Sequence, residues 1–429
     1  MSVILLLLIF GVILYTLLKF GDWYVLAIMP TLTILMDIII MHGVGDDAGN
    51  SIAFLRGTIL IFTFIVLSKR INKYNYNYAI IIIFIFYLFI ITTIIGHVDE
   101  SILIGYDFVA RIFITLFSFI VSFSIINNEY QYQKLCMYTM LGGAIFIVYI
   151  IIANIFGFGM SLYGKEDDLI NHSLISVGNM GGNSFNYLAY TITVLPLIVY
   201  NNKKKYIKIL AFSSGVLGVI ILLLTFRRSA LFIILVSVLL HSSMINNKNY
   251  LKIFLSVALI SLPLLIFSYS FIENIFSIRG ESVLQYESIS SAGGRTGEIE
   301  YVNNIALNSE LKNMMFGTSL NTRGVYGNYN RSLHSDISVL IYRFGYISLL
   351  LFLSINFIIY NTFSRLKRYS PAKIYVMVFV IFFITNLLMM IPGRMTSLSF
   401  NLLVYIHMGA IMGFLLKNKK DVSEKSYLR

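Results

Sequence analysis

Residues 79–96, with the sequence AIIIIFIFYLFIITTIIG, form an uncharged apolar segment of 18 residues. A helix needs about 20 predominantly apolar residues to cross a hydrocarbon core about 30 Å thick. The segment therefore predicts one membrane-spanning helix, and apolar runs of similar length recur on both sides of it.

Thirteen such runs are predicted, near residues 3–19, 23–42, 51–68, 79–96, 106–126, 136–157, 185–200, 209–226, 229–245, 253–272, 338–360, 374–391 and 397–416. With 58% hydrophobic and 12% charged residues, the 429-residue chain has too little polar surface for a soluble globule. The sequence predicts an all-α polytopic membrane protein of about 12 to 14 transmembrane helices, organised as one integral membrane domain over residues 1–429.

The basic connections between spans fall on alternate sides of the count. They contain Lys69, Arg70 and Lys73; Lys134; Lys203, Lys204, Lys205 and Lys208; Lys248 and Lys252; and Arg365, Lys367, Arg368 and Lys373, and the tail from Lys417 is also basic. Cytoplasmic loops are enriched in lysine and arginine, so we expect these connections and the C-terminus in the cytoplasm. Cytoplasmic anchoring also explains the net charge of +12 without a nucleic-acid partner.

The same alternation predicts that residues 273–337 form one large extracytoplasmic loop. A connection of this length is usually functional. Within it, Thr296–Asn308 has Glu298 and Glu300 near a helix start and apolar residues on one face. This pattern predicts a short amphipathic helix lying on the membrane surface.

Charged residues within or beside spans are few, and most are arginines. Asp107 and Arg111 are four residues apart, a spacing that predicts an ion pair on one helix face. Arg56 and Arg343 lie one to two turns inside the outer ends of their spans, where they snorkel outward or project into a cavity.

Arginines dominate the cations at the outer side and the outer ends of spans: Arg227, Arg228, Arg295, Arg323, Arg331, Arg343 and Arg394. The planar guanidinium binds phosphate through two parallel hydrogen bonds, and a low dielectric strengthens each contact. A lipid pyrophosphate is the ligand that this chemistry fits at this depth. Anchoring to anionic lipid headgroups, and the polar residues that a tight turn requires, are the alternative explanations.

His334 closes the large loop and is a candidate general base, because histidine titrates near neutral pH. A solvated loop histidine is the alternative. The other five histidines show no metal-ligand spacing, and Cys136 is the only cysteine, so we expect no metal and no cofactor.

Three motifs resemble the superfamily of O-antigen polymerases and O-antigen ligases of bacterial envelopes, which have about a dozen spans and one large outer loop late in the chain. They are Thr225-Phe226-Arg227-Arg228-Ser229-Ala230, Gly293-Gly294-Arg295-Thr296, and His334-Ser335 followed by Tyr342-Arg343-Phe344-Gly345-Tyr346. The match covers residues 180 to 400. The chain departs from the family pattern at Tyr301, which stands where a tryptophan is expected.

The resemblance implies an O-antigen or capsular polysaccharide polymerase, a glycosyltransferase of the bacterial inner (plasma) membrane. It would move a growing glycan from undecaprenyl pyrophosphate to a hydroxyl of a lipid-linked repeat unit, with a chain-length regulator protein as a further candidate partner. Arg228 and Arg295 would stabilise the departing pyrophosphate and His334 would orient or deprotonate the acceptor. Arg227, Arg323, Arg331, Arg343 and Arg394 would bind the substrate.

Two other functions fit the same sequence. An O-antigen ligase uses the same chemistry with a different final acceptor. A flippase or transporter of lipid-linked oligosaccharide should place charges through the middle of several spans, whereas the arginines here cluster toward one side.

Overall fold

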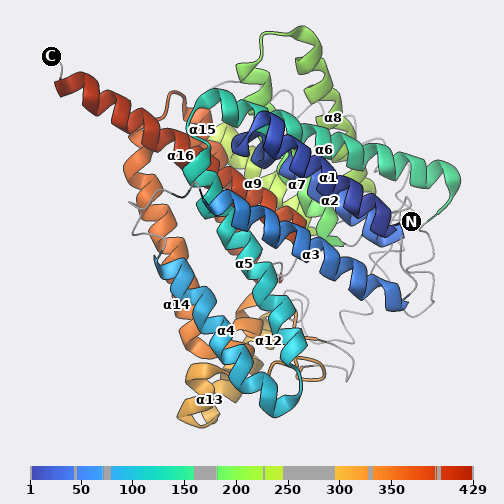
Figure 1. Cartoon of the computed structure of the whole chain (residues 1–429), viewed down its shortest axis with the longest axis vertical. Coiled ribbons are helices and arrows are strands. Elements are labelled where there is room, and N and C mark those ends of the chain that lie inside the picture. The colour runs from blue at the N-terminus through green and yellow to red at the C-terminus, as the bar shows by residue number, and fades with distance from the viewer. Residues whose placement is uncertain are drawn as a thin grey trace.

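The structure is a computed structural model that describes residues 2–42, 46–69, 71, 79–158, 180, 182–225, 228–244, 295–326, 332–391, 393 and 398–427. Its helices are α1 (Ser2–Phe20), α2 (Asp22–His42), α3 (Asp46–Ser68), α4 (Ala79–Asp99), α5 (Ile102–Ile125), α6 (Glu129–Phe156), α7 (Gly182–Asn201), α8 (Lys205–Leu224), α9 (Arg228–Met244), α12 (Arg295–Asn308), α13 (Leu311–Phe316), α14 (Asp336–Leu366), the 3-10 helix η5 (Lys367–Tyr369), α15 (Lys373–Leu388) and α16 (Leu398–Tyr427). Figure 1 shows them as one helical bundle.

The expected all-α architecture is confirmed in the described part of the chain. Each expected span coincides with a helix, except 253–272, which lies outside the described residues. Eight of these helices are long and apolar enough to cross a membrane, and three shorter apolar helices accompany them. The chain is therefore a multi-pass membrane protein.

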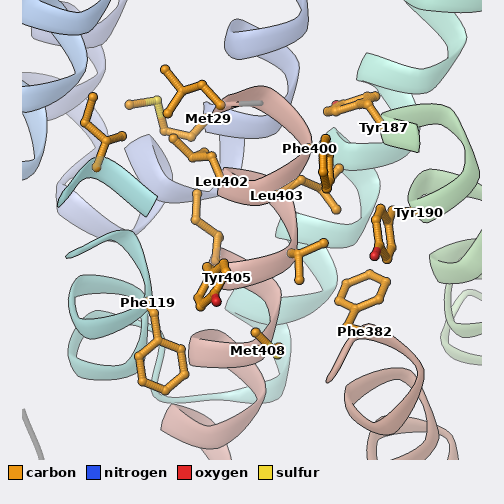
Figure 2. Packing of buried hydrophobic residues seen from close by; sticks show 14 of the residues in the cluster. Met29, Phe119, Tyr187, Tyr190, Phe382, Phe400, Leu402, Leu403, Tyr405 and Met408 are labelled. Atoms are coloured by element: carbon orange, nitrogen blue, oxygen red, sulfur yellow. The ribbon is translucent and has the colours of Figure 1, made fainter. Parts of the chain in front are cut away.

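Helix α16 forms the centre of the bundle. Its residues from Leu398 to Leu415 are all buried, and Figure 2 shows its aromatic and aliphatic side chains packed among the surrounding helices. Any side chain at Gly409 or Gly413 would overlap backbone carbonyls of α5, so these glycines allow the two helices to approach closely. Small residues at this spacing are the usual means of close helix packing in membranes.

The outward faces of the bundle carry large apolar side chains. Phe86 of α4 is 64% exposed, and Phe357 of α14 is 67% exposed. A monomeric soluble protein seldom exposes so much contiguous apolar surface, whereas a lipid-facing helix is expected to do so.

One end of the bundle carries the basic connections. The side chain of Asn201, at the end of α7, donates to the Tyr375 hydroxyl of α15 over 2.8 Å, and that hydroxyl donates to Glu129 at the start of α6. At the same end, Asn418 of α16 donates to the carbonyl of Tyr369 over 3.4 Å. The described basic segments beside these bonds, at the start of α6, the end of α7, the start of α15 and the end of α16, thus lie at one end of the bundle, whereas residues 70, 73, 248 and 252 lie outside the described residues.

The opposite end contains the helices of the large loop. Figure 1 shows α12 and α13 there, packed against α14 and far from the C-terminal end of α16. The expected ion pair lies on α5 near this end, with Arg111 Nη2 2.7 Å from Asp107 Oδ2. The loop helices and the first turn of α14 bring several predicted site residues to this end.

Candidate functional site

Helix α14 is broken at Gly345, ten residues into its course. Gly345 has φ 70° and ψ 178°, a conformation that side-chain-bearing residues rarely adopt. A Cβ atom there would also overlap the backbone of Met315, at the end of α13. The sequence therefore breaks the helix at a glycine, and the loop helix α13 packs against the break.

The break exposes backbone carbonyls that the loop and α4 then satisfy. The Thr318 N–H donates to the Tyr342 carbonyl over 2.7 Å, and the Tyr87 hydroxyl donates to the Phe344 carbonyl over 2.6 Å. Because a buried carbonyl without a partner is costly in an apolar environment, these bonds fix the loop to α14 just where Arg343 projects.

Thr322 connects two of the predicted site residues. Its hydroxyl accepts a hydrogen bond from Arg343 Nη2 over 3.3 Å, and its carbonyl accepts from the Leu333 N–H over 3.2 Å, one residue before His334. Arg323, the next residue along the loop, pairs through its backbone with Ser332. These contacts hold the segments that carry Arg323, His334 and Arg343 next to one another.

The Arg343 side chain is half-buried and stacks on an aromatic ring. Its guanidinium carbon lies 5.3 Å from the centroid of Phe108 in α5, which in turn stacks on Phe344 at 5.4 Å. A cation over an aromatic face is attracted by about 0.5–2 kcal/mol, more when water is excluded. The contact holds the guanidinium beside the Phe108 ring.

The expected loop helix is present as α12, and one of its acidic residues has an unexpected environment. Glu298 is fully buried, and its Oε1 accepts from the N–H groups of His334 over 2.8 Å and of Ser335 over 2.7 Å. Val302 and Ala306 of the same helix are also buried. The helix therefore packs on the start of α14 as part of the bundle.

The end of α15 completes the surroundings of His334. The Asp336 N–H donates to the Met390 carbonyl over 2.9 Å, and the Ser335 hydroxyl donates to the same carbonyl over 3.4 Å. The backbone of Gly393 lies against the carbonyl of His334, where a Cβ atom would overlap the oxygen. The His334 side chain is exposed, so a fixed backbone presents an accessible imidazole.

A small cavity with a mixed polar and apolar lining lies beside Asp336. It has a volume of about 20 Å³, and its lining includes Asp336, Thr115, Asn386, Asn401 and Tyr405. All five side chains are buried. The volume is that of about one water molecule, and the polar side chains of the lining are the groups that such a water would bind.

The remaining predicted site residues are only partly described. Arg227, Arg331 and Arg394 lie outside the described residues, and Arg228 and Arg295 are described by their backbones alone. Arg295 begins α12, one turn before Glu298. Arg228 begins α9, where the Ser229 hydroxyl donates to Asn186 of α7 over 2.8 Å.

Sequence reasoning missed three residues of this site: Glu298, Thr322 and Phe108. In the sequence, Glu298 looks like any acidic residue in the first turn of a helix, because the residues that bind it lie 36 and 37 positions further along the chain. Thr322 lies in a loop and Phe108 lies in an apolar segment, and neither belongs to a recognisable motif. A glycine inside the Tyr342–Tyr346 motif is the sequence signal that could have indicated a helix break there.

A scan against protein-family models and a search of curated proteins both find no match for this chain.

Proposed function

We propose that the protein is a polysaccharide polymerase of the bacterial inner membrane, acting on undecaprenyl-pyrophosphate-linked repeat units at the outer face. The observation that carries the proposal is the set of contacts through Thr322, which links the segments that carry Arg323, His334 and Arg343. A lipid-linked pyrophosphate presents its charge and its sugar at the depth where apolar helices begin.

In the proposed transfer reaction, arginines bind the pyrophosphate and a histidine acts as the base. The hydroxyl oxygen of the acceptor sugar attacks the anomeric carbon of the donor, the bond from that carbon to the pyrophosphate oxygen breaks, and undecaprenyl pyrophosphate departs. His334 accepts the hydroxyl proton, a role usually worth about 10² to 10⁴ in rate. Arg343 and Arg323 bind the pyrophosphate through planar donor groups.

Arg295 and Arg228 complete the proposal by stabilising the charge that grows on the departing pyrophosphate. Preorganised donors of this kind are worth about 3–4 kcal/mol each in a dry site. Arg227, Arg331 and Arg394 stay predicted substrate-binding residues. In this arrangement residues 273–337 face outward, the basic end of the bundle and the C-terminus face the cytoplasm, and a chain-length regulator protein is a further partner.

The test is deletion of the gene in its host, with complementation by the wild-type chain and by His334→Ala and Arg343→Ala. We expect surface polysaccharide to collapse to a single repeat unit in the deletion strain and in both variants, with normal protein amounts in the membrane. Arg365→Ala is the matched control, since Arg365 is an exposed arginine at the opposite, basic end.

Other outcomes assign other functions. Polymer that accumulates on its lipid carrier without reaching a final acceptor would identify a ligase. Repeat units trapped at the cytoplasmic face would identify a flippase, and an unchanged gel ladder in the deletion strain would refute the glycan function.

A further inference from the structure

The peptide groups on both sides of His334 are held in place by other elements. On the amino side, one carboxylate oxygen of Glu298 accepts the N–H of His334 and the N–H of Ser335. On the carboxyl side, the carbonyl of His334 lies against Gly393, and the next residues bind the Met390 carbonyl. The backbone at His334 is therefore fixed, and its imidazole is the exposed group.

The position of Glu298 explains why a carboxylate is tolerated there. Ser335 is the N-cap of α14 and makes no side-chain capping bond within its own helix. The orphan N–H groups at a helix start favour an acceptor, and the helix dipole favours a negative charge. Glu298 of α12 supplies both the hydrogen-bond acceptor and the negative charge. A residue of one helix therefore caps the start of another helix.

We propose that Glu298 is a positioning residue for the transfer reaction, an inference that rests on the polymerase function proposed above. Its carboxylate ties the start of α14 to α12, and Arg295 lies one turn earlier on that same helix. The bond thus sets the spacing between the backbone that carries the proposed base and the backbone that carries a proposed pyrophosphate ligand. Glu298 itself touches no reacting atom in this scheme.

A positioning role predicts a particular kinetic signature. A misplacement of about 1 Å in a catalytic group can cost about 10²-fold in rate while binding is retained. We expect Glu298→Ala to lower kcat for chain growth by about 10²-fold with little change in KM. Glu298→Gln keeps an oxygen that can accept both N–H groups, so we expect it to retain activity within about 10-fold of wild type.

The experiment uses full-length protein in proteoliposomes with repeat units extracted from host membranes on their undecaprenyl pyrophosphate carrier. Glu300→Ala is the matched control, because Glu300 is an exposed carboxylate on the same helix. Hydrogen exchange of the peptide that contains His334 and Ser335 is measured in parallel. We expect faster exchange in Glu298→Ala alone, since only that variant removes the acceptor.

The two measurements separate the inference from the function on which it rests. If the wild-type protein forms no polymer, the polymerase function is refuted. The hydrogen-exchange data still test the hydrogen bonds from His334 and Ser335 to Glu298. Active wild type with an equally active Glu298→Ala overturns the positioning role. Unchanged exchange in Glu298→Ala, or a Glu298→Gln variant as inactive as Glu298→Ala, overturns it as well.

Discussion

The carboxylate of Asp37 in α2 forms an ion pair with the guanidinium of Arg56 in α3, within the apolar part of the bundle. The Ser399 hydroxyl, at the start of α16, donates to the second carboxylate oxygen. The two charged side chains are only 12% and 16% exposed. One charge pair and one hydroxyl therefore connect three helices, and neither charge would be stable there alone.

Removing one partner of this pair should be strongly destabilising. Arg56→Ala leaves the Asp37 carboxylate buried without its counter-charge, a change that typically costs about 3–5 kcal/mol. We expect a lower temperature of aggregation for the detergent-solubilised protein, measured by size-exclusion chromatography after heating.

The control for this prediction is Arg111→Ala. The Arg111 and Asp107 side chains are 35% and 60% exposed, so the loss of their pair should cost about 0–1 kcal/mol. Equal thermal shifts in the two variants would contradict the structural role assigned to Asp37 and Arg56.

Gly345→Ala should disrupt the join between α13 and α14. The substitution places a side chain at φ 70° and against the backbone of Met315, a strain of about 1–3 kcal/mol before the overlap is counted. We expect reduced protein in the membrane and a shortened polysaccharide ladder. Gly11→Ala in α1 meets no atom within 4 Å and should leave both unchanged.

Gly393→Ala should impair activity and also strain the backbone, since Gly393 has φ 80°. The added methyl group would overlap the His334 carbonyl and shift the segment that presents the imidazole. We expect chain growth to fall by about 10²-fold in the reconstituted assay, as for other small misplacements of a catalytic group. Gly57→Ala is the control, because its methyl group would enter open space. Wild-type rates for Gly393→Ala would show that His334 does not depend on this contact.

Arg343→Lys tests whether the guanidinium plane matters or only the charge. Lysine keeps the charge but cannot stack its head group on Phe108 or form two parallel bonds to a phosphate. We expect at least about a tenfold loss of polymer with normal protein amounts, measured by quantitative gel of surface glycan. Full activity of the lysine variant would show that only the positive charge at position 343 matters.

Hydropathy predicted most of the fold, because the thickness of the bilayer sets the length of each span. The helix spacing rule also found the pair between Asp107 and Arg111, four residues apart on one helix. It missed Asp37 with Arg56, since these residues are 19 positions apart on two helices and only packing brings them together.

The candidate site residues stay predictions from the sequence, and the structure adds the contacts between the segments that carry them. His334, Arg323 and Arg343 were selected by residue type and position along the chain, and the contacts of Thr322 and the bridge between Arg323 and Ser332 link the segments that carry them. Thr322 and Glu298 were missed because their roles are contacts between distant segments, made by residue types that are common in any loop or helix start. No local pattern encodes such a contact.

The position of the break at Gly345 also sets the length of the helix that follows it. The helix that follows it runs to Leu366 and, at about 1.5 Å per residue, covers roughly 30 Å, the full hydrocarbon thickness. The short piece before the break is then spared from crossing lipid and can carry polar groups at the headgroup level. Inserting one helical turn after Gly345 would displace the histidine and its neighbours by about 5.4 Å along the membrane normal. The distance of His334 from the basic end of the bundle is thus set by the number of residues in a single helix.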